Sequence, residues 1–201
     1  MKRILVLFST YNGQTEKIAL NIRERLIAIG FDVEISNLKA ASGHSFDDFD
    51  GIIAGAAVHF SKFEKHFRAV VSQNAFVLSK TPTAFFSVCL GILETKPETQ
   101  LAERKIVTDF FEETMWQPNQ WAIFAGALTY TQYGWLKKHV MRVIALRAGN
   151  KTDPRYDYEF TNWKEVELFA DRFAVLVNAA DQVNFSKSNP DRKSQVTSHQ
   201  I

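Results

Sequence analysis

The stretch Arg3-Ile4-Leu5-Val6-Leu7-Phe8-Ser9-Thr10-Tyr11-Asn12-Gly13-Gln14-Thr15 decides the fold. It begins with a short apolar run that predicts a buried strand, and a helical pattern starts near Gln14. Between them lies a turn with several hydroxyls and one glycine, Gly13. Backbone N–H groups at a helix start have no partner within the helix and carry partial positive charge. We therefore predict an anion site, where the hydroxyls donate and the glycine lets a phosphate approach the backbone.

The turn lacks the patterns that bind other phosphates. It contains neither Gly-x-Gly-x-x-Gly, which is typical of dinucleotide sites, nor the Gly-x4-Gly-Lys-Ser/Thr loop of nucleoside triphosphate sites. Hydroxyl and N–H donors without a lysine suit a phosphate monoester that is held and not transferred, such as that of flavin mononucleotide (FMN). The turn resembles the first loop of the flavodoxin family, Ser/Thr-x-Thr/Asn-Gly-x-Thr. An ordinary strand-to-helix turn with Asn-Gly is the alternative.

Composition indicates one compact domain. The chain has 201 residues, of which 46% are hydrophobic and 23% charged, so it can bury a full core. One cysteine, Cys89, excludes an internal disulfide and suits a reducing compartment. The apolar start is too short for a signal peptide, and no run approaches the roughly 18 apolar residues that span a membrane.

Apolar strands and amphipathic helices alternate along the chain. Strands are predicted at about residues 3–8, 31–38, 50–58, 82–90 and 121–130, and helices at about 14–29, 61–79, 98–114 and 162–180. Strands that are apolar throughout favour a parallel sheet covered on both faces. The sequence therefore predicts an α/β fold, a flavodoxin-like doubly wound sheet of five parallel strands, over residues 1–180. The polar tail, residues 181–201, is predicted to be disordered.

In this fold the ligand lies beyond the carboxyl ends of the strands. The resemblance to flavodoxins implies that the segments there hold FMN, with the ring commonly between aromatic side chains. The residues implied as cofactor contacts are Ser9, Thr10, Tyr11, Asn12, Gly13, Gln14, Thr15, Ala57, Val58, His59, Ser87, Val88, Cys89, Leu90, Gly91, Gly126, Ala127 and Tyr130. The segment 90–98 has no aromatic residue, so one face of the ring is predicted to be open to a flat substrate. The alternative is that Tyr130 or Tyr133 covers it.

Residues 131–160 form an insertion near the fifth strand. A helix is predicted over 135–148, with apolar side chains at helical spacing. These are Leu136, Val140, Val143 and Ile144, with Lys137, Lys138 and Arg142 beside or opposite them. No acidic residue occurs from Gly134 to Asn150. A basic amphipathic helix suits an anionic membrane surface. The alternative is a helix that packs on its own domain and exposes a basic face.

With the insertion included, residues 1–180 resemble the quinone-dependent protoporphyrinogen oxidases of bacterial haem synthesis. The matching pieces include Leu7–Thr10, Asn12–Thr15, Ala54–Phe60, Ala84–Val88, Trp116–Pro118, Ala125–Tyr130, Tyr133–Trp135, Gly149–Asp153 and Tyr158–Trp163. The resemblance implies hydride transfer from protoporphyrinogen IX to FMN, and then reduction of menaquinone or ubiquinone. It also implies a peripheral protein on the cytoplasmic face of a bacterial cell membrane. His59 is the candidate acid or base by position, and we expect no metal.

The sequence leaves two other functions open. A flavodoxin-type electron carrier is the first, although such carriers are usually strongly acidic and this chain has a formal charge of +2. The second is a regulator without FMN, or a protein whose basic insertion binds nucleic acid. No recognised nucleic-acid motif accompanies the insertion, so we expect no nucleic-acid partner. The sequence leaves a homo-oligomer open.

Overall fold

The fold is a five-stranded parallel sheet between two layers of helices. The computed structural model describes residues 1–38, 45–94, 96–128 and 158–188. The strands have the order β2-β1-β3-β4-β5, and every neighbouring pair is parallel. They are β1 Arg3–Ser9, β2 Asp32–Asn37, β3 Gly51–Ala57, β4 Thr83–Val88 and β5 Gln120–Phe124. This arrangement confirms the predicted flavodoxin-like fold.

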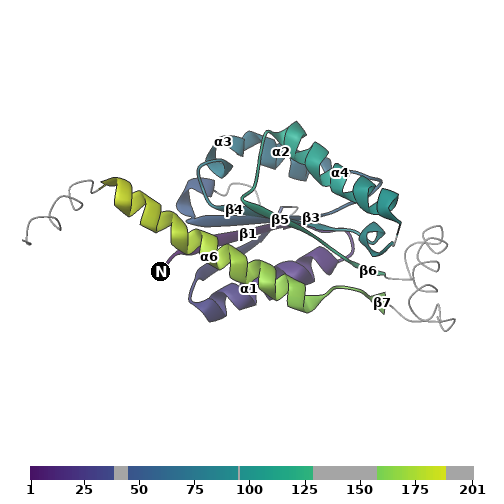
Figure 1. Cartoon of the computed structure of the whole chain (residues 1–201), viewed down its shortest axis with the longest axis horizontal. Coiled ribbons are helices and arrows are strands. Elements are labelled where there is room, and N and C mark those ends of the chain that lie inside the picture. The colour runs from purple at the N-terminus through teal and green to yellow at the C-terminus, as the bar shows by residue number, and fades with distance from the viewer. Residues whose placement is uncertain (39–44, 95, 129–157, 189–201) are drawn as a thin grey trace, which may run out of the picture.

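Helices cover both faces of the sheet. Helices α1 and α6 lie on one face, and α2, α3 and α4 lie on the other (Figure 1). Their bounds are α1 Gln14–Ile29, α2 Lys65–Gln73, α3 Ala75–Leu78, α4 Pro97–Thr114 and α6 Trp163–Ser188, with short 3-10 turns η1 Phe46–Asp48 and η2 Gly91–Leu93. A second, two-stranded sheet pairs β6 Ala127–Leu128 with β7 Tyr158–Glu159.

The alternation of side chains along each strand divides the core in two. In β1, Ile4, Val6 and Phe8 pack with α1 and α6, whereas Leu5 and Leu7 pack with α2 and α4. Successive strand residues point to opposite faces, so a strand that is apolar throughout supplies both layers. The α4 layer is rich in aromatic rings, and the ring of Phe85 lies 5.2 Å from that of Phe110, centroid to centroid.

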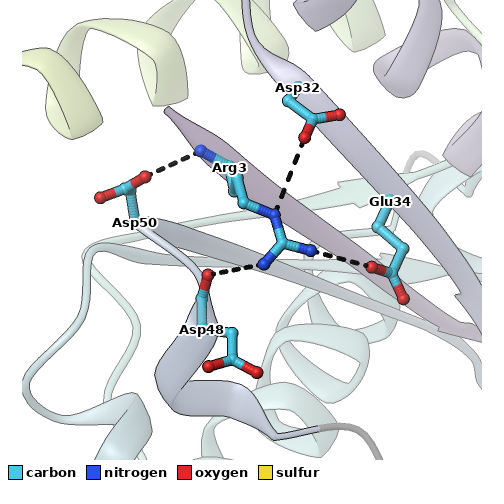
Figure 2. A network of polar contacts seen from close by, with 5 residues as sticks. All are labelled: Arg3, Asp32, Glu34, Asp48 and Asp50. Carbon is cyan, nitrogen blue, oxygen red and sulfur yellow. Dashed lines mark hydrogen bonds and ion pairs between the residues drawn. The ribbon is translucent and has the colours of Figure 1, made fainter. Parts of the chain in front are cut away.

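The amino end of the sheet is closed by polar contacts around Arg3 (Figure 2). The backbone N–H of Arg3 donates to the Asp50 carboxylate at 2.8 Å. Its guanidinium donates to the carbonyl of Asp48 at 3.3 Å and forms ion pairs with Glu34 at 3.5 Å and Asp32 at 3.7 Å. These contacts tie β1 to β2 and to the chain that enters β3.

Three predicted element boundaries are wrong. Residues 61–79 are not one helix, because a tight turn occupies 59–62 and Asn74 separates α2 from α3. The fifth strand does not continue to Tyr130: β5 ends at Phe124, and the chain leaves the parallel sheet to form β6. The last helix does not end at Ala180 but continues to Ser188, so this part of the tail is helical.

Candidate cofactor site

The start of α1 lies at the carboxyl end of β1, as the sequence predicted. Gly13 is the N-cap residue and adopts a left-handed conformation with φ +82°. It has no side chain to cap the first helical turn, so the N–H groups of that turn can donate to an anion. The hydroxyl oxygen of Thr10 accepts a hydrogen bond from the Gly13 N–H at 2.9 Å, which closes the loop.

Two predicted phosphate residues direct their side chains elsewhere in the fold. The amide of Gln14 donates to the Thr161 hydroxyl at 2.8 Å, and this hydroxyl donates to the Ala125 carbonyl at 2.8 Å. Gln14 thereby ties α1 to the chain on either side of the insertion. The Ser9 hydroxyl donates to the Glu64 carboxylate, just before α2. Neither Thr161 nor Glu64 was predicted as a site residue, because both contacts join segments far apart in sequence.

The loop after β3 contacts the loop after β1. The rings of Tyr11 and His59 are stacked, with centroids 4.5 Å apart and 19° between their planes. His59 and Lys62 form an antiparallel bridge, and the intervening Phe60 and Ser61 have φ of +49° and +58°. Phe60 is 72% exposed at the tip of this turn. A left-handed backbone conformation at an exposed aromatic residue is unusual, and such outliers occur often at functional sites.

The carboxyl end of β4 brings a buried polar group to the same edge. Ser87 is fully buried, and among the described residues its hydroxyl has no hydrogen-bond partner. The neighbouring strands hold this end in place, because the Val58 N–H donates to the Val88 carbonyl at 3.0 Å and the Cys89 N–H donates to the Phe124 carbonyl at 3.1 Å. A buried hydroxyl without a partner at the carboxyl end of the sheet suits a bound ligand that would complete its hydrogen bonding.

The fourth predicted segment is described only in part. Gly126 is buried, and its carbonyl accepts a hydrogen bond from the Phe160 N–H at 3.1 Å. Ala127 lies in β6, and Lys17 of α1 forms an ion pair with Glu159 of β7 at 3.3 Å. The base of the insertion is thus anchored beside the start of α1. Tyr130, Tyr133 and the predicted helix 135–148 lie outside the described residues.

Two further features of the described residues concern membranes and metals. None of the helices that the structure describes combines the length and apolarity needed to cross a bilayer. Within the same part of the chain, no three His, Cys, Asp or Glu side chains are grouped as a metal site would require.

This fold and site define the class of protein. The model of the flavodoxin domain family matches residues 5–155, and the chain belongs to that family. Oxidised flavodoxin 1 from Bacillus cereus, a solved structure, has 13% sequence identity and a TM-score of 0.51, and the match covers 86% of this chain and 97% of that one. This likeness supports the fold.

Among curated proteins the chain is similar to several named "Protoporphyrinogen IX dehydrogenase [quinone]". The Escherichia coli K12 protein is 29% identical over 177 residues, which cover 88% of this chain and 97% of the relative. The Leishmania major protein is 28% identical over 176 residues, which cover 87% and 75% respectively. The resemblance stated from the sequence is thereby confirmed.

The flavodoxin domain identifies FMN as the cofactor, and the residues at the carboxyl end of the sheet fit that group. The uncapped first turn of α1 suits a phosphate, because its donors are backbone N–H groups and no lysine occupies the turn. The Tyr11–His59 stack and the exposed Phe60 provide flat apolar surface for a ring. The buried Ser87 hydroxyl adds hydrogen-bonding capacity that this chain itself leaves unused among its described residues.

Proposed function

We propose that this protein is an FMN-dependent dehydrogenase that oxidises protoporphyrinogen IX and passes the electrons to a membrane quinone. The similarity to the E. coli protein of that name over 97% of the relative's length carries the proposal. The formal charge of +2 also favours it over an electron carrier of the acidic flavodoxin type. When bound, FMN supplies the chemistry of hydride acceptance from the substrate and of electron release to the quinone.

In this proposal three segments at the carboxyl end of the sheet bind different parts of FMN. The first turn of α1 and the hydroxyl of Thr10 hold the phosphate, and Gly13 lets it approach the backbone. The loop with His59 and Phe60 lies along the ring, and the turn after β4 meets the other side of the ring. Because residues 90–94 have no aromatic side chain, this side leaves room for a large flat substrate. His59 is the candidate proton acceptor, on position alone.

We also propose that the segment 135–148 holds the protein on the cytoplasmic face of a bacterial cell membrane. The supporting observation is its basic composition, with no acidic residue from Gly134 to Asn150. The strands that flank the insertion, β6 and β7, pair next to the proposed cofactor site. Replacing Lys137, Lys138 and Arg142 by glutamate should reduce binding to anionic vesicles and quinone turnover while the FMN content stays unchanged. Unchanged vesicle binding contradicts this part of the proposal.

An anaerobic titration tests the proposed reaction. Protoporphyrinogen IX is added to the purified yellow protein, and the visible flavin absorbance is followed. We expect the absorbance to bleach and to recover when a quinone is added. A protein that stays oxidised with this substrate, but is reduced by a flavoprotein reductase, is a flavodoxin-type carrier.

A further inference from the structure

A half-buried glutamate, Glu103, lies directly behind the turn that follows β4. The Glu103 side chain extends from α4 against Gly91. A Cβ atom added to Gly91 would overlap Oε1 of Glu103 and lie 2.7 Å from its Cδ and 3.0 Å from its Cγ. Glycine is therefore the residue that lets this carboxyl reach the turn. Neither Glu103 nor its contact with Gly91 was predicted from the sequence.

The same carboxyl also contacts Cys89, at the other end of this turn. Cys89 is buried, and its thiol lies close enough to the Glu103 carboxyl and to the backbone of Gly91 and Ile92 for these groups to affect its pKa. Burial raises the pKa of the Cys89 thiol, and the charge of Glu103 raises it further. Glu103 thus contacts both Cys89 and Gly91, and the turn Cys89–Gly91 is built around its carboxyl.

Glu103 keeps this place at a cost in stability. Its Oε2 atom is enclosed and has no hydrogen-bond partner among the described residues. Burial raises the pKa of the Glu103 carboxyl, because leaving water disfavours its charged form. A leucine would fill such a space without an orphaned polar atom, so packing alone does not account for a carboxyl here.

We propose that Glu103 is a positioning residue for the flavin: its carboxyl fixes the backbone of the turn Cys89–Gly91 at the edge where the ring binds. This inference rests on the proposed function, because that function brings a ring to this edge. Hydrogen bonds through the η2 turn also connect α4 to Gly91. The Gln100 amide of α4 donates to the Glu94 carbonyl at 2.9 Å, and the Glu94 N–H donates to the Gly91 carbonyl at 3.1 Å.

Cys89 provides a direct reporter, because it is the chain's one cysteine. The rate at which a thiol reagent labels Cys89 in the FMN-free protein measures how firmly the turn is held. We expect Glu103→Ala to raise this rate about tenfold, because the thiol loses its partner and its cover. Gly91→Ala should raise it similarly by displacing the carboxyl. Glu103→Gln keeps the shape and a carbonyl acceptor but removes the charge, so its labelling rate should rise less than that of Glu103→Ala.

FMN affinity provides the second readout. The dissociation constant should rise about tenfold in Glu103→Ala and stay within about twofold of the native value in Glu103→Gln. Glu112→Ala is the matched control, because Glu112 is an exposed carboxylate on the same helix. The double variant Gly91→Ala/Glu103→Ala should be no weaker than Glu103→Ala alone, since the added methyl group then has room.

Native labelling rates and native FMN affinity in Glu103→Ala overturn the inference. Equal losses of FMN affinity in Glu103→Gln and Glu103→Ala also overturn it. The shape of the side chain, which glutamine keeps, would then not be what supports FMN binding. The labelling experiment needs neither substrate nor quinone, so it is independent of the reaction. If the protein binds FMN but does not oxidise protoporphyrinogen IX, the proposed function fails while the role of Glu103 is still tested.

Discussion

At the amino end of the parallel sheet, Arg3 meets three carboxylates and a backbone carbonyl, whereas the carboxyl end keeps an uncapped helix start and an orphaned hydroxyl. The amino end has paired charges, which satisfy one another (Figure 2). The carboxyl end has the open first turn of α1, the strained tip at Phe60 and the buried Ser87. The difference teaches that this molecule closes one end for stability and leaves hydrogen-bonding capacity at the other for a ligand.

Substitutions at the two ends of α1 should give the largest difference in FMN affinity between the two ends of the sheet. Gly13 and Gly30 are both left-handed glycines, at the start and the end of the helix, with φ +82° and +105°. Gly13→Asp should weaken FMN binding about 100-fold, because a carboxylate at the helix start repels the phosphate and competes for its donors. Gly30→Asp introduces the same side chain at the amino end and should leave FMN affinity unchanged.

Both glycine variants should lose about 1–2 kcal/mol of stability, since neither conformation suits a residue with a Cβ. Fluorescence titration of the FMN-free protein measures the affinity, and urea unfolding measures the stability. Equal effects of the two variants on FMN affinity would remove the distinction between the two ends.

The network at Arg3 is the second test. Arg3→Ala should reduce the free energy of unfolding by about 1 kcal/mol, because the ion pairs are partly exposed and the side chain also covers the ring of Phe49. High salt should weaken the ionic part of this effect. FMN affinity should not change. A loss of FMN affinity at unchanged stability would contradict the assignment of this end to stability.

A third pair of variants compares backbone strain at the two ends of the sheet. Phe60 and Met115 are exposed residues with φ of +49° and +54°. Phe60 lies at the carboxyl end, while Met115 ends α4 near the start of β5 at the amino end. Replacing either by glycine should stabilise the FMN-free protein by about 0.5–1 kcal/mol. Only Phe60→Gly should also weaken FMN binding or turnover, which steady-state kinetics would detect.

Glu103→Gln should produce the smallest change, and one that depends on pH. Burial raises the pKa of Glu103 above its ordinary value of 4.5, so the folded protein holds this proton more tightly than the unfolded chain. Its contribution to stability is complete below pH 4.5 and is lost as pH rises through the raised value. Cys89, which faces Glu103 across the turn, has a raised pKa and remains a thiol over this range.

The glutamine variant carries no such proton. Its stability relative to the native protein should therefore increase as the pH is raised from 4.5. Thermal unfolding of the two FMN-free proteins from acid to neutral pH measures this difference. A difference that does not vary with pH would show that folding does not raise the pKa of Glu103.

Much of the site was predictable from the sequence, because its determinants are local. The apolar run Ile4–Phe8, the turn at Gly13 and the helix beyond it follow one another along the chain, so periodicity and turn chemistry predict them. The interruption at residues 59–62 was missed, since its left-handed turn has no glycine or proline signal. The end of β5 was missed because β6 pairs with a strand that follows the insertion.

The sequence by itself determined the parallel sheet, the helices that cover it and the helix start at its carboxyl edge. Burial patterns and helix starts are properties of neighbouring residues, and they persist in any packing. Only the tertiary structure decided that Gln14 bonds to Thr161, that Ser9 bonds to Glu64 and that Glu103 stands behind Gly91. Each of these contacts joins separate elements, and nothing in the local sequence specifies which side chains will meet when the layers pack.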